Sequence, residues 1–522
     1  MKRLPILSLY AAILAWAISL YAGIPPRLMD EMLIISQPSA ESSVPITMTE
    51  NVLVSNILVT ITPTGSGYPT NPWLYTLNGT LTMANYNFYS SDPSSDFRNL
   101  TLNMGGNALF GTQTATNFNL SVPITASRWP QNLTITNVGS IQIGKVWTYY
   151  GNADGWYEPA GSVTIGANVN GQRAGNVEIA EILAYHRYIL SSLTSEGVEI
   201  YSSGNVSIWN GSVDGDISTY ITRGDSPSGP ITVKHHGAFR ARNLDTYNSG
   251  LRSESIILDG DITATGIIGS MACSLIQTYV SGGGQFYAGS VTVTNYMQVS
   301  IANGIYAYSG YADIYNWVSG GGTVNVSCAS NILIGTVNTY SLGAYSGGGK
   351  SASPITLSTS GGNITITNTL DSHGVQGDGA NIIVSAGAGN IAVSNALTSS
   401  SVSGTAGNIR VNALGNILMG SMNLDGSTNS TEGVLSITNT ASTATITVSL
   451  LDIAKCKNAY FSAGSGTNYI TALLNFNTTS PTNGEITAAG GTVFYDSANT
   501  NNAYLATNNY TLSSGSLKPG VP

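Results

Sequence analysis

The stretch GNIRVNALGNILMG, from Gly407 to Gly420, contains two short runs of alternating apolar and polar residues separated by a glycine. Successive side chains of an extended chain point to opposite faces, so Ile409 and Val411 point one way. Gly415 then turns the chain, and Ile417 and Met419 form the next inward-facing set. Glycine and asparagine favour such corners because they adopt backbone conformations that other residues avoid. The stretch therefore predicts two strands joined by a tight corner.

The same layout recurs along most of the chain. Twelve units can be marked by their first inward residue: Leu100, Leu133, Val163, Val198, Ile231, Ile256, Val291, Val324, Ile355, Ile382, Ile409 and Leu435. Their spacing of 25 to 35 residues is typical of a solenoid or another repeat array. Alternation with period two inside each unit, rather than helical spacing, predicts an all-β fold, a parallel β-helix of about 12 or more coils.

The chain divides into five expected regions. Residues 1–23 are expected to form a signal peptide or, alternatively, an uncleaved anchor, because Met1-Lys2-Arg3 precedes an almost wholly apolar run. Residues 24–99 should contain a linker and irregular N-terminal cap strands, and residues 100–448 the β-helix. Residues 449–512 should form C-terminal β strands or a cap, and residues 513–522 a flexible tail.

One segment departs from the strand pattern. Between residues 176 and 197, Ile182, Tyr185, Ile189 and Leu193 fall at helical spacing. They could line one side of a helix of about three turns. A short helical insertion is therefore an alternative to a strand here.

Composition narrows the functional classes. The chain of 522 residues has 60 glycines, 9% charged residues and a net charge of −9. Few basic residues argue against nucleic acid as a partner, because phosphate binding needs clustered Lys and Arg. The cysteines, Cys273, Cys328 and Cys456, are few, distant and without CxxC spacing. We expect them to be buried, with one bridge between coils as an alternative, and we expect no metal site and no cofactor.

The corners have a characteristic composition. Gly-Asn followed by Ile or Val occurs at residues 204–206, 362–364, 389–391, 407–409 and 415–417. This style of repeat, over about residues 100–448, resembles that of filamentous-haemagglutinin-like and autotransporter passenger proteins. The resemblance implies a right-handed β-helix that is secreted or exposed at the cell surface and has an adhesive or structural role. The implied partners are a host or neighbouring-cell surface, extracellular matrix or polysaccharide, with self-association as a further alternative.

Charge is concentrated between Asp214 and Asp261, a span with 12 of the 18 + 27 = 45 charged residues of the chain. Asp259 and Asp261 stand on the same side of a strand and, with Arg240, form the alternative catalytic set for a polysaccharide lyase or glycoside hydrolase. The same two carboxylates could also suit a hard cation. The interpretation that the sequence favours is an ordinary solvated outer face, since the motifs typical of such enzymes are missing.

Two further motifs carry weaker signals. His235 and His236 are adjacent, so in a strand they should face opposite sides, which argues against a shared zinc. Arg223, Gly224 and Asp225 resemble an integrin-binding loop and fall between repeat units, where an exposed loop is expected. A tripeptide is a weak signal, and chance is the favoured explanation.

These observations predict a secreted or cell-surface structural or adhesive β-helix protein without catalytic activity. A polysaccharide-active enzyme that uses residues 214–261 is the alternative. A self-assembling extracellular filament or surface-layer subunit is the second alternative.

Overall fold

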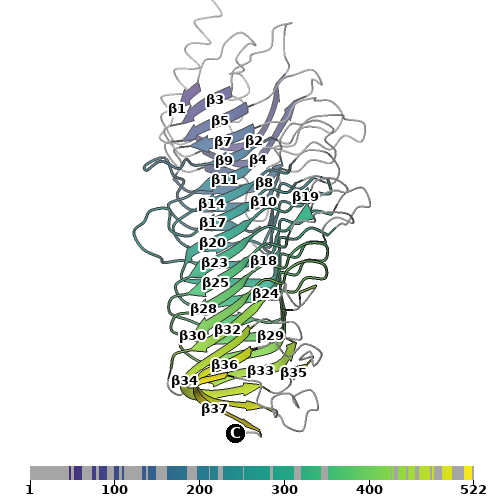
Figure 1. Ribbon diagram of the computed structural model, residues 1–522. Helices are drawn as coiled ribbons and strands as arrows, with labels where there is room; N and C mark the ends of the chain where they lie inside the picture. Colours follow the sequence, from purple (N-terminus) through teal and green to yellow (C-terminus); the bar gives the residue numbers. More distant parts are fainter. Residues whose placement is uncertain are drawn as a thin grey trace, which may run out of the picture.

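The computed structural model describes strands from Ile46 to Pro519 and, with side chains, most of residues 161–448 and a few residues between 134 and 146. Within 161–448 the gaps are 185–196, 211, 222–226, 251, 282–285, 311–318, 343–350, 425, 428–432 and 442–444. The described strands are all paired in parallel, and one continuous sheet contains 35 of them. Figure 1 shows them as rungs stacked along a rod, from β1 to β37. The chain is a parallel β-solenoid, as predicted.

The first column of stacked strands begins each coil. It contains β1 (Ile46–Met48), β3 (Trp73–Leu77), β5 (Asn99–Met104), β7 (Asn132–Thr136), β9 (Val163–Ile165), β11 (Val198–Tyr201), β14 (Ile231–Lys234), β17 (Ile256–Asp259), β20 (Val291–Tyr296), β23 (Val324–Cys328), β25 (Ile355–Thr359), β28 (Ile382–Ala386), β30 (Ile409–Ala413) and β32 (Val434–Asn439). Each strand pairs with the next one in this column.

The second column follows the corner. It contains β2 (Val52–Ile61), β4 (Leu81–Ser90), β6 (Ala108–Phe110), β8 (Ile141–Trp147), β10 (Val177–Leu183), β12 (Val206–Ile208), β15 (Phe239–Arg240), β18 (Ser270–Gln277), β21 (Gln298–Tyr306), β24 (Ile332–Asn338), β26 (Ile364–Ile366), β29 (Ile391–Thr398), β31 (Ile417–Asn423) and β33 (Thr445–Asp452).

The third column consists partly of separate strands, β13 (Asp216–Ser218), β16 (Asn243–Asp245), β27 (Leu370–Asp371) and β35 (Leu473–Leu474). Elsewhere it consists of the C-terminal halves of long second-column strands, as where β18 pairs with both β15 and β16.

Near the C-terminus lie β34 (Asn458–Ile470), β36 (Glu485–Tyr495) and β37 (Thr511–Pro519), and β37 falls in the range expected to be a flexible tail. A side sheet joins β19 (Phe286–Tyr287) to β22 (Ser319–Gly320).

The core is a set of apolar ladders. In the first column, Val198, Ile231, Ile256, Val291, Val324, Ile355, Ile382, Ile409 and Leu435 are in register and fully buried. Burial of each such side chain contributes about 1.5 to 3 kcal/mol relative to an exposed one. Since each coil buries its ladder residues against its neighbours, stability comes from stacking rather than from any single coil.

The number of turns differs from the prediction. The structure shows a solenoid of about eight turns, which is fewer than the 12 or more coils expected. Segments that join the strands nearer both ends lie outside the described residues. The strand register nevertheless continues toward the N-terminus, where Leu100 pairs with Leu133 and Leu133 with Val163.

The recurring Gly-Asn corners have a specific hydrogen-bonding role. Asn363 Oδ1 accepts from the backbone N–H of Asn390 (2.8 Å), and Asn390 Oδ1 accepts from that of Asn416 (2.7 Å). Asn205 and Asn408 accept in the same way from the following coil. The side chains thus extend the backbone ladder around the corner, where strand pairing stops. This explains why asparagine recurs at this position.

The helical alternative is wrong for the part of its segment that the structure describes. Strand β10 occupies residues 177–183, and Val177, Ile179 and Ile182 are fully buried. It pairs with β8 on one side and with β12 and β13 on the other. This pairing outweighs the local helical spacing. Residues 185–196, with Tyr185, Ile189 and Leu193, lie outside the described part of the chain, as does the expected signal peptide.

None of the described residues forms a helix that is long and apolar enough to cross a membrane.

Candidate functional site

The stretch from Asp214 to Asp261 covers one complete coil and parts of its neighbours, and its two histidines point in opposite directions, as predicted. His235, at the end of β14, is fully buried. Its Nε2 lies 2.9 Å from the hydroxyl of Tyr296 in the core. His236 is on the outside, with a side chain that is 17% exposed. The two rings cannot ligate one metal ion.

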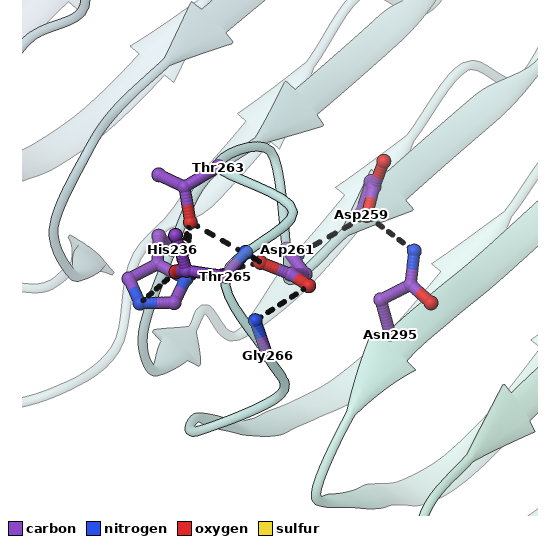
Figure 2. Close-up of polar contacts among 7 residues, drawn as sticks. All are labelled: His236, Asp259, Asp261, Thr263, Thr265, Gly266 and Asn295. Carbon is purple, nitrogen blue, oxygen red and sulfur yellow. Dashed lines mark hydrogen bonds and ion pairs between the residues drawn. The ribbon is translucent and has the colours of Figure 1, made fainter.

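Asp261 organises a surface loop beside His236 (Figure 2). Its carboxylate accepts hydrogen bonds from the hydroxyl of Thr263 and the backbone N–H groups of Thr265 and Gly266, each at 3.2 Å. His236 Nδ1 lies 3.3 Å from Asp261 Oδ1 and 3.0 Å from the Thr263 hydroxyl. The loop is tight, since Ala264 and Gly266 have positive φ angles. Asp261 therefore acts as the acceptor around which residues 261–266 fold.

The ionisation of Asp261 follows from these contacts. Desolvation favours its neutral form, but the hydrogen bonds from Gly266, Thr263, Thr265 and His236 outweigh this effect and lower the pKa of Asp261. A general acid in glycoside hydrolysis needs a raised pKa so that it still holds a proton near neutral pH. Asp261 has the opposite property.

Asp259 lies next to Asp261 but faces a different partner. Its Oδ1 accepts from the side-chain amide of Asn295 at 2.9 Å and from the backbone N–H of Asp261 at 3.2 Å. Figure 2 shows Asp259 turned toward Asn295, while Asp261 points toward Gly266. Strand β17 ends at Asp259, so Asp261 lies in the loop beyond it and not on the same side of one strand as expected, and each carboxylate is bound to its own donors.

Arg240, the third member of the predicted catalytic alternative, has a different partner. Its guanidinium Nε donates to Asp214 Oδ1 at 2.7 Å, and Nη2 makes an ion pair with the same oxygen. It also lies over the ring of Trp209, 4.9 Å from the centroid. The contacts among the described residues thus join Asp259 to Asp261 and bind Arg240 to Asp214 of the preceding coil.

The neighbouring charges are also paired. Arg242 binds Asp216 through Nε and Nη2, at 2.8 and 2.5 Å, and Arg252 Nε lies 3.1 Å from Glu254 Oε1. The hydrogen bonds and charge of Asp216 raise the pKa of Arg242. Such exposed pairs contribute about 0 to 1 kcal/mol each. The charged patch therefore consists largely of local pairs on the surface of the rod.

Asp245 is a site residue that sequence reasoning did not single out. Burial raises its pKa to about 6, and the charge of Asp216 acts in the same direction. The backbone N–H of Tyr247 donates to Asp245 at 2.8 Å and partly opposes the shift. The place of Asp245 at the end of a third-column strand could have been inferred only from the coil register.

A row of aromatic rings was also not predicted from the sequence. Tyr247, Tyr279, Tyr308, Tyr340 and His373 lie in consecutive coils with successive ring centroids 4.5 to 5.1 Å apart. We call these five residues the aromatic strip. Their sequence separations of 32, 29, 32 and 33 residues match the coil period. That recurrence is the signal that could have revealed them.

The described residues contain no group of three or more His, Cys, Asp or Glu arranged to hold a metal ion. Cys273 and Cys328 are buried free thiols whose pKa values are raised by burial. Cys456 and the triplet Arg223, Gly224 and Asp225 lie outside the described residues.

Comparison with known proteins gives no relative: no family model matches the chain, and neither the curated proteins nor the solved structures contain a match.

Proposed function

We propose that this chain is a secreted or cell-surface β-helix protein that acts without catalysis, as an adhesive or structural scaffold. The observation that carries the proposal is the use of the charged residues between Asp214 and Asp261. Asp261 holds a loop and Arg240 is engaged by Asp214. These side chains stabilise the surface of a regular rod instead of converging on a common point.

The shape of the fold supports the same role. The buried ladders run without interruption from Val198 to Leu435. The outward-facing side chains of successive coils therefore recur about every 4.8 Å along the rod. Extended solenoid surfaces of this kind are suited to binding long or repeated partners. The Gly-Asn corners resemble those of filamentous-haemagglutinin-like and autotransporter passenger proteins, which suggests a place outside the cell.

The enzymatic alternative is less well supported. A lyase or hydrolase centred on Asp259, Asp261 and Arg240 would need the three groups to face one substrate, whereas their contacts point to separate partners. The lowered pKa of Asp261 also makes it unsuited to donate a proton near neutral pH. A self-assembling filament or surface-layer subunit is the second alternative.

Attachment measurements test the adhesive role. Beads coated with the full chain are incubated with bacterial cells, cultured animal cells and extracellular matrix films, beside beads coated with albumin. We expect attachment to at least one surface above the albumin level, and this attachment should be reduced by free chain added in solution. Attachment equal to that of albumin on every surface would contradict an adhesive role.

A further inference from the structure

The aromatic strip lies at the surface of the rod, where its rings are partly exposed. The rings of Tyr279 and Tyr308 are stacked at 5.0 Å with an interplanar angle of 12°, and those of Tyr308 and Tyr340 at 4.5 Å and 18°. His373 continues the stack on Tyr340 at 5.1 Å and 18°. All the rings are half-buried. The faces therefore pack against one another, while edges and polar tips remain at the surface.

Stacking by itself does not explain the choice of tyrosine. Phenylalanine would stack equally well, and a phenol hydroxyl is useful where one end of the ring meets water or a ligand. The Tyr247 hydroxyl lies 2.5 Å from Ser281 Oγ, and a hydroxyl in one such bond can still donate to or accept from another group.

A second column of polar side chains runs beside the strip. Asp245, Gln277, Tyr306, Asn338 and Asp371 are paired in register along the third column. Each lies two residues before a member of the aromatic strip, so both sets point outward on the same side of their strands. Asn338 Oδ1 is buried and has no hydrogen-bond partner among the described residues. We call these five residues the polar column.

Together the two columns combine aromatic edges with hydroxyl, amide and carboxylate groups. Because the ring faces are stacked on one another, the rings offer their edges and phenol hydroxyls, and these groups together with the amides and carboxylates suit the hydroxyls of a sugar. The ten residues include no Lys or Arg, although Asp371 Oδ1 lies 2.7 Å from His373 Nδ1, and the carboxylates of Asp245 and Asp371 would repel an anionic polymer. Five coils at about 4.8 Å extend over roughly 19 Å, which fits several sugar units of a chain.

We propose that the aromatic strip and the polar column form a binding surface for a neutral polysaccharide that lies along the rod. The proposal rests on the proposed adhesive function and names its ligand class. The ring edges contact the sugars, and the phenol hydroxyls and side-chain amides exchange hydrogen bonds with sugar hydroxyls. The carboxylates of Asp245 and Asp371 disfavour acidic polymers.

Affinity electrophoresis of the full chain tests this surface. Native gels contain dextran, mixed-linkage β-glucan, galactomannan or arabinoxylan as neutral probes, and polygalacturonate or hyaluronate as acidic probes. We expect at least one neutral probe to retard the chain. The double variant Tyr308→Ala/Tyr340→Ala should weaken this binding by about tenfold or more, as expected for central aromatic contacts. Tyr308→Phe, which keeps the stack, should weaken it several-fold.

The matched control is Tyr201→Ala, which removes a half-buried tyrosine from the first column, outside the strip. It should bind like the wild type, and circular dichroism should show that each variant keeps its β signal. Failure of every neutral probe to retard the chain would overturn the proposal, as would retardation only by acidic probes. The proposal would also be overturned if Tyr308→Phe and the double variant were both retarded as strongly as the wild type.

Bead attachment separates the two proposals. If attachment to cells or matrix persists while no neutral polysaccharide binds, the proposed ligand surface is wrong and the adhesive function stands. If attachment is lost as well, the proposed function itself fails.

Discussion

The hydroxyl of Tyr296 reaches past Gly260 to His235 Nε2, 2.9 Å away, and joins two coils through the interior of the solenoid. His235 follows β14 at the position that Ser202 holds after β11, so both coils bury a polar side chain there, and His235 also lies near the ring of Phe239. A buried polar group without a partner costs about 1 to 3 kcal/mol. The bond therefore gives His235 Nε2 and the Tyr296 hydroxyl a polar partner inside the rod.

Acid should weaken the rod through His235. Burial lowers the pKa of His235 to about 4, compared with about 6.5 for an exposed histidine. Between these values the unfolded state binds the proton more readily, so stability falls as pH decreases from about 6.5 to about 4, by roughly 3 kcal/mol in all. Thermal melting at pH 7 and pH 5 should show a smaller decrease for His235→Leu than for the wild type. Equal decreases would exclude His235 as the cause.

Gly260 should resist substitution, because it leaves room for the ring of Tyr296. A Cβ there would lie 2.4 Å from the carbonyl oxygen of Asn295 and 2.8 Å from Tyr296 Cδ1. Gly260→Ala should destabilise the chain by about 1 to 3 kcal/mol, as overpacking of a core does. Tyr296→Phe keeps the ring but removes the hydroxyl, and should destabilise through the loss of the bond to His235. A Gly260→Ala variant that melts like the wild type would contradict the packing described here.

Asp245→Asn should stabilise the chain at neutral pH. Its folded pKa of about 6 exceeds the usual value of 3.8, so the stability that protonation gives is present below about pH 4 and lost as pH rises through 6. The neutral amide avoids this cost, and the expected gain at pH 7 is about 1 to 3 kcal/mol. The gain should disappear at pH 4. A gain of equal size at both pH values would show that charge is not its origin.

The corner asparagines should protect backbone amides in the next coil. Asn390→Ala removes the acceptor for the N–H of Asn416, a net loss of about 0.5 to 1.5 kcal/mol. Hydrogen exchange of the Asn416 amide should become faster. Asn412→Ala is the control, because Asn412 is an exposed asparagine on the neighbouring strand β30. If the Asn416 amide exchanges at the wild-type rate in both variants, the side chain of Asn390 does not protect it.

The repeat could be predicted from the sequence, but the contacts between coils could not. Alternation is local, so Ile409 and Leu435 could be marked as inward-facing before their pairing was known. The opposite directions of His235 and His236 followed from strand geometry alone. Tyr308 and Tyr340, by contrast, meet only after two coils of unequal length are aligned. Ile182 was ambiguous because its helical spacing is a local signal, whereas its strand depends on pairing with the coils on either side.

The charged residues show the same limit. Asp259 and Asp261 were expected on the same side of a strand, but β17 ends at Asp259 and Asp261 lies in the loop that follows. That Arg240 binds Asp214 depends on a contact across 26 residues, which spacing does not reveal. Composition could identify the concentration of charge between 214 and 261, but only the fold shows which groups pair.

The central claim, a scaffold that binds without catalysis, is tested most directly by measuring product release. The full chain is incubated with the neutral and acidic polysaccharides named above, and reducing ends and unsaturated products are quantified against heat-inactivated chain. We predict no release above that control, and no difference between the wild type and the variants Asp259→Ala, Asp261→Asn and Arg240→Ala. Release by the wild type that any of these substitutions abolishes would contradict the account and identify the charged patch as an active site.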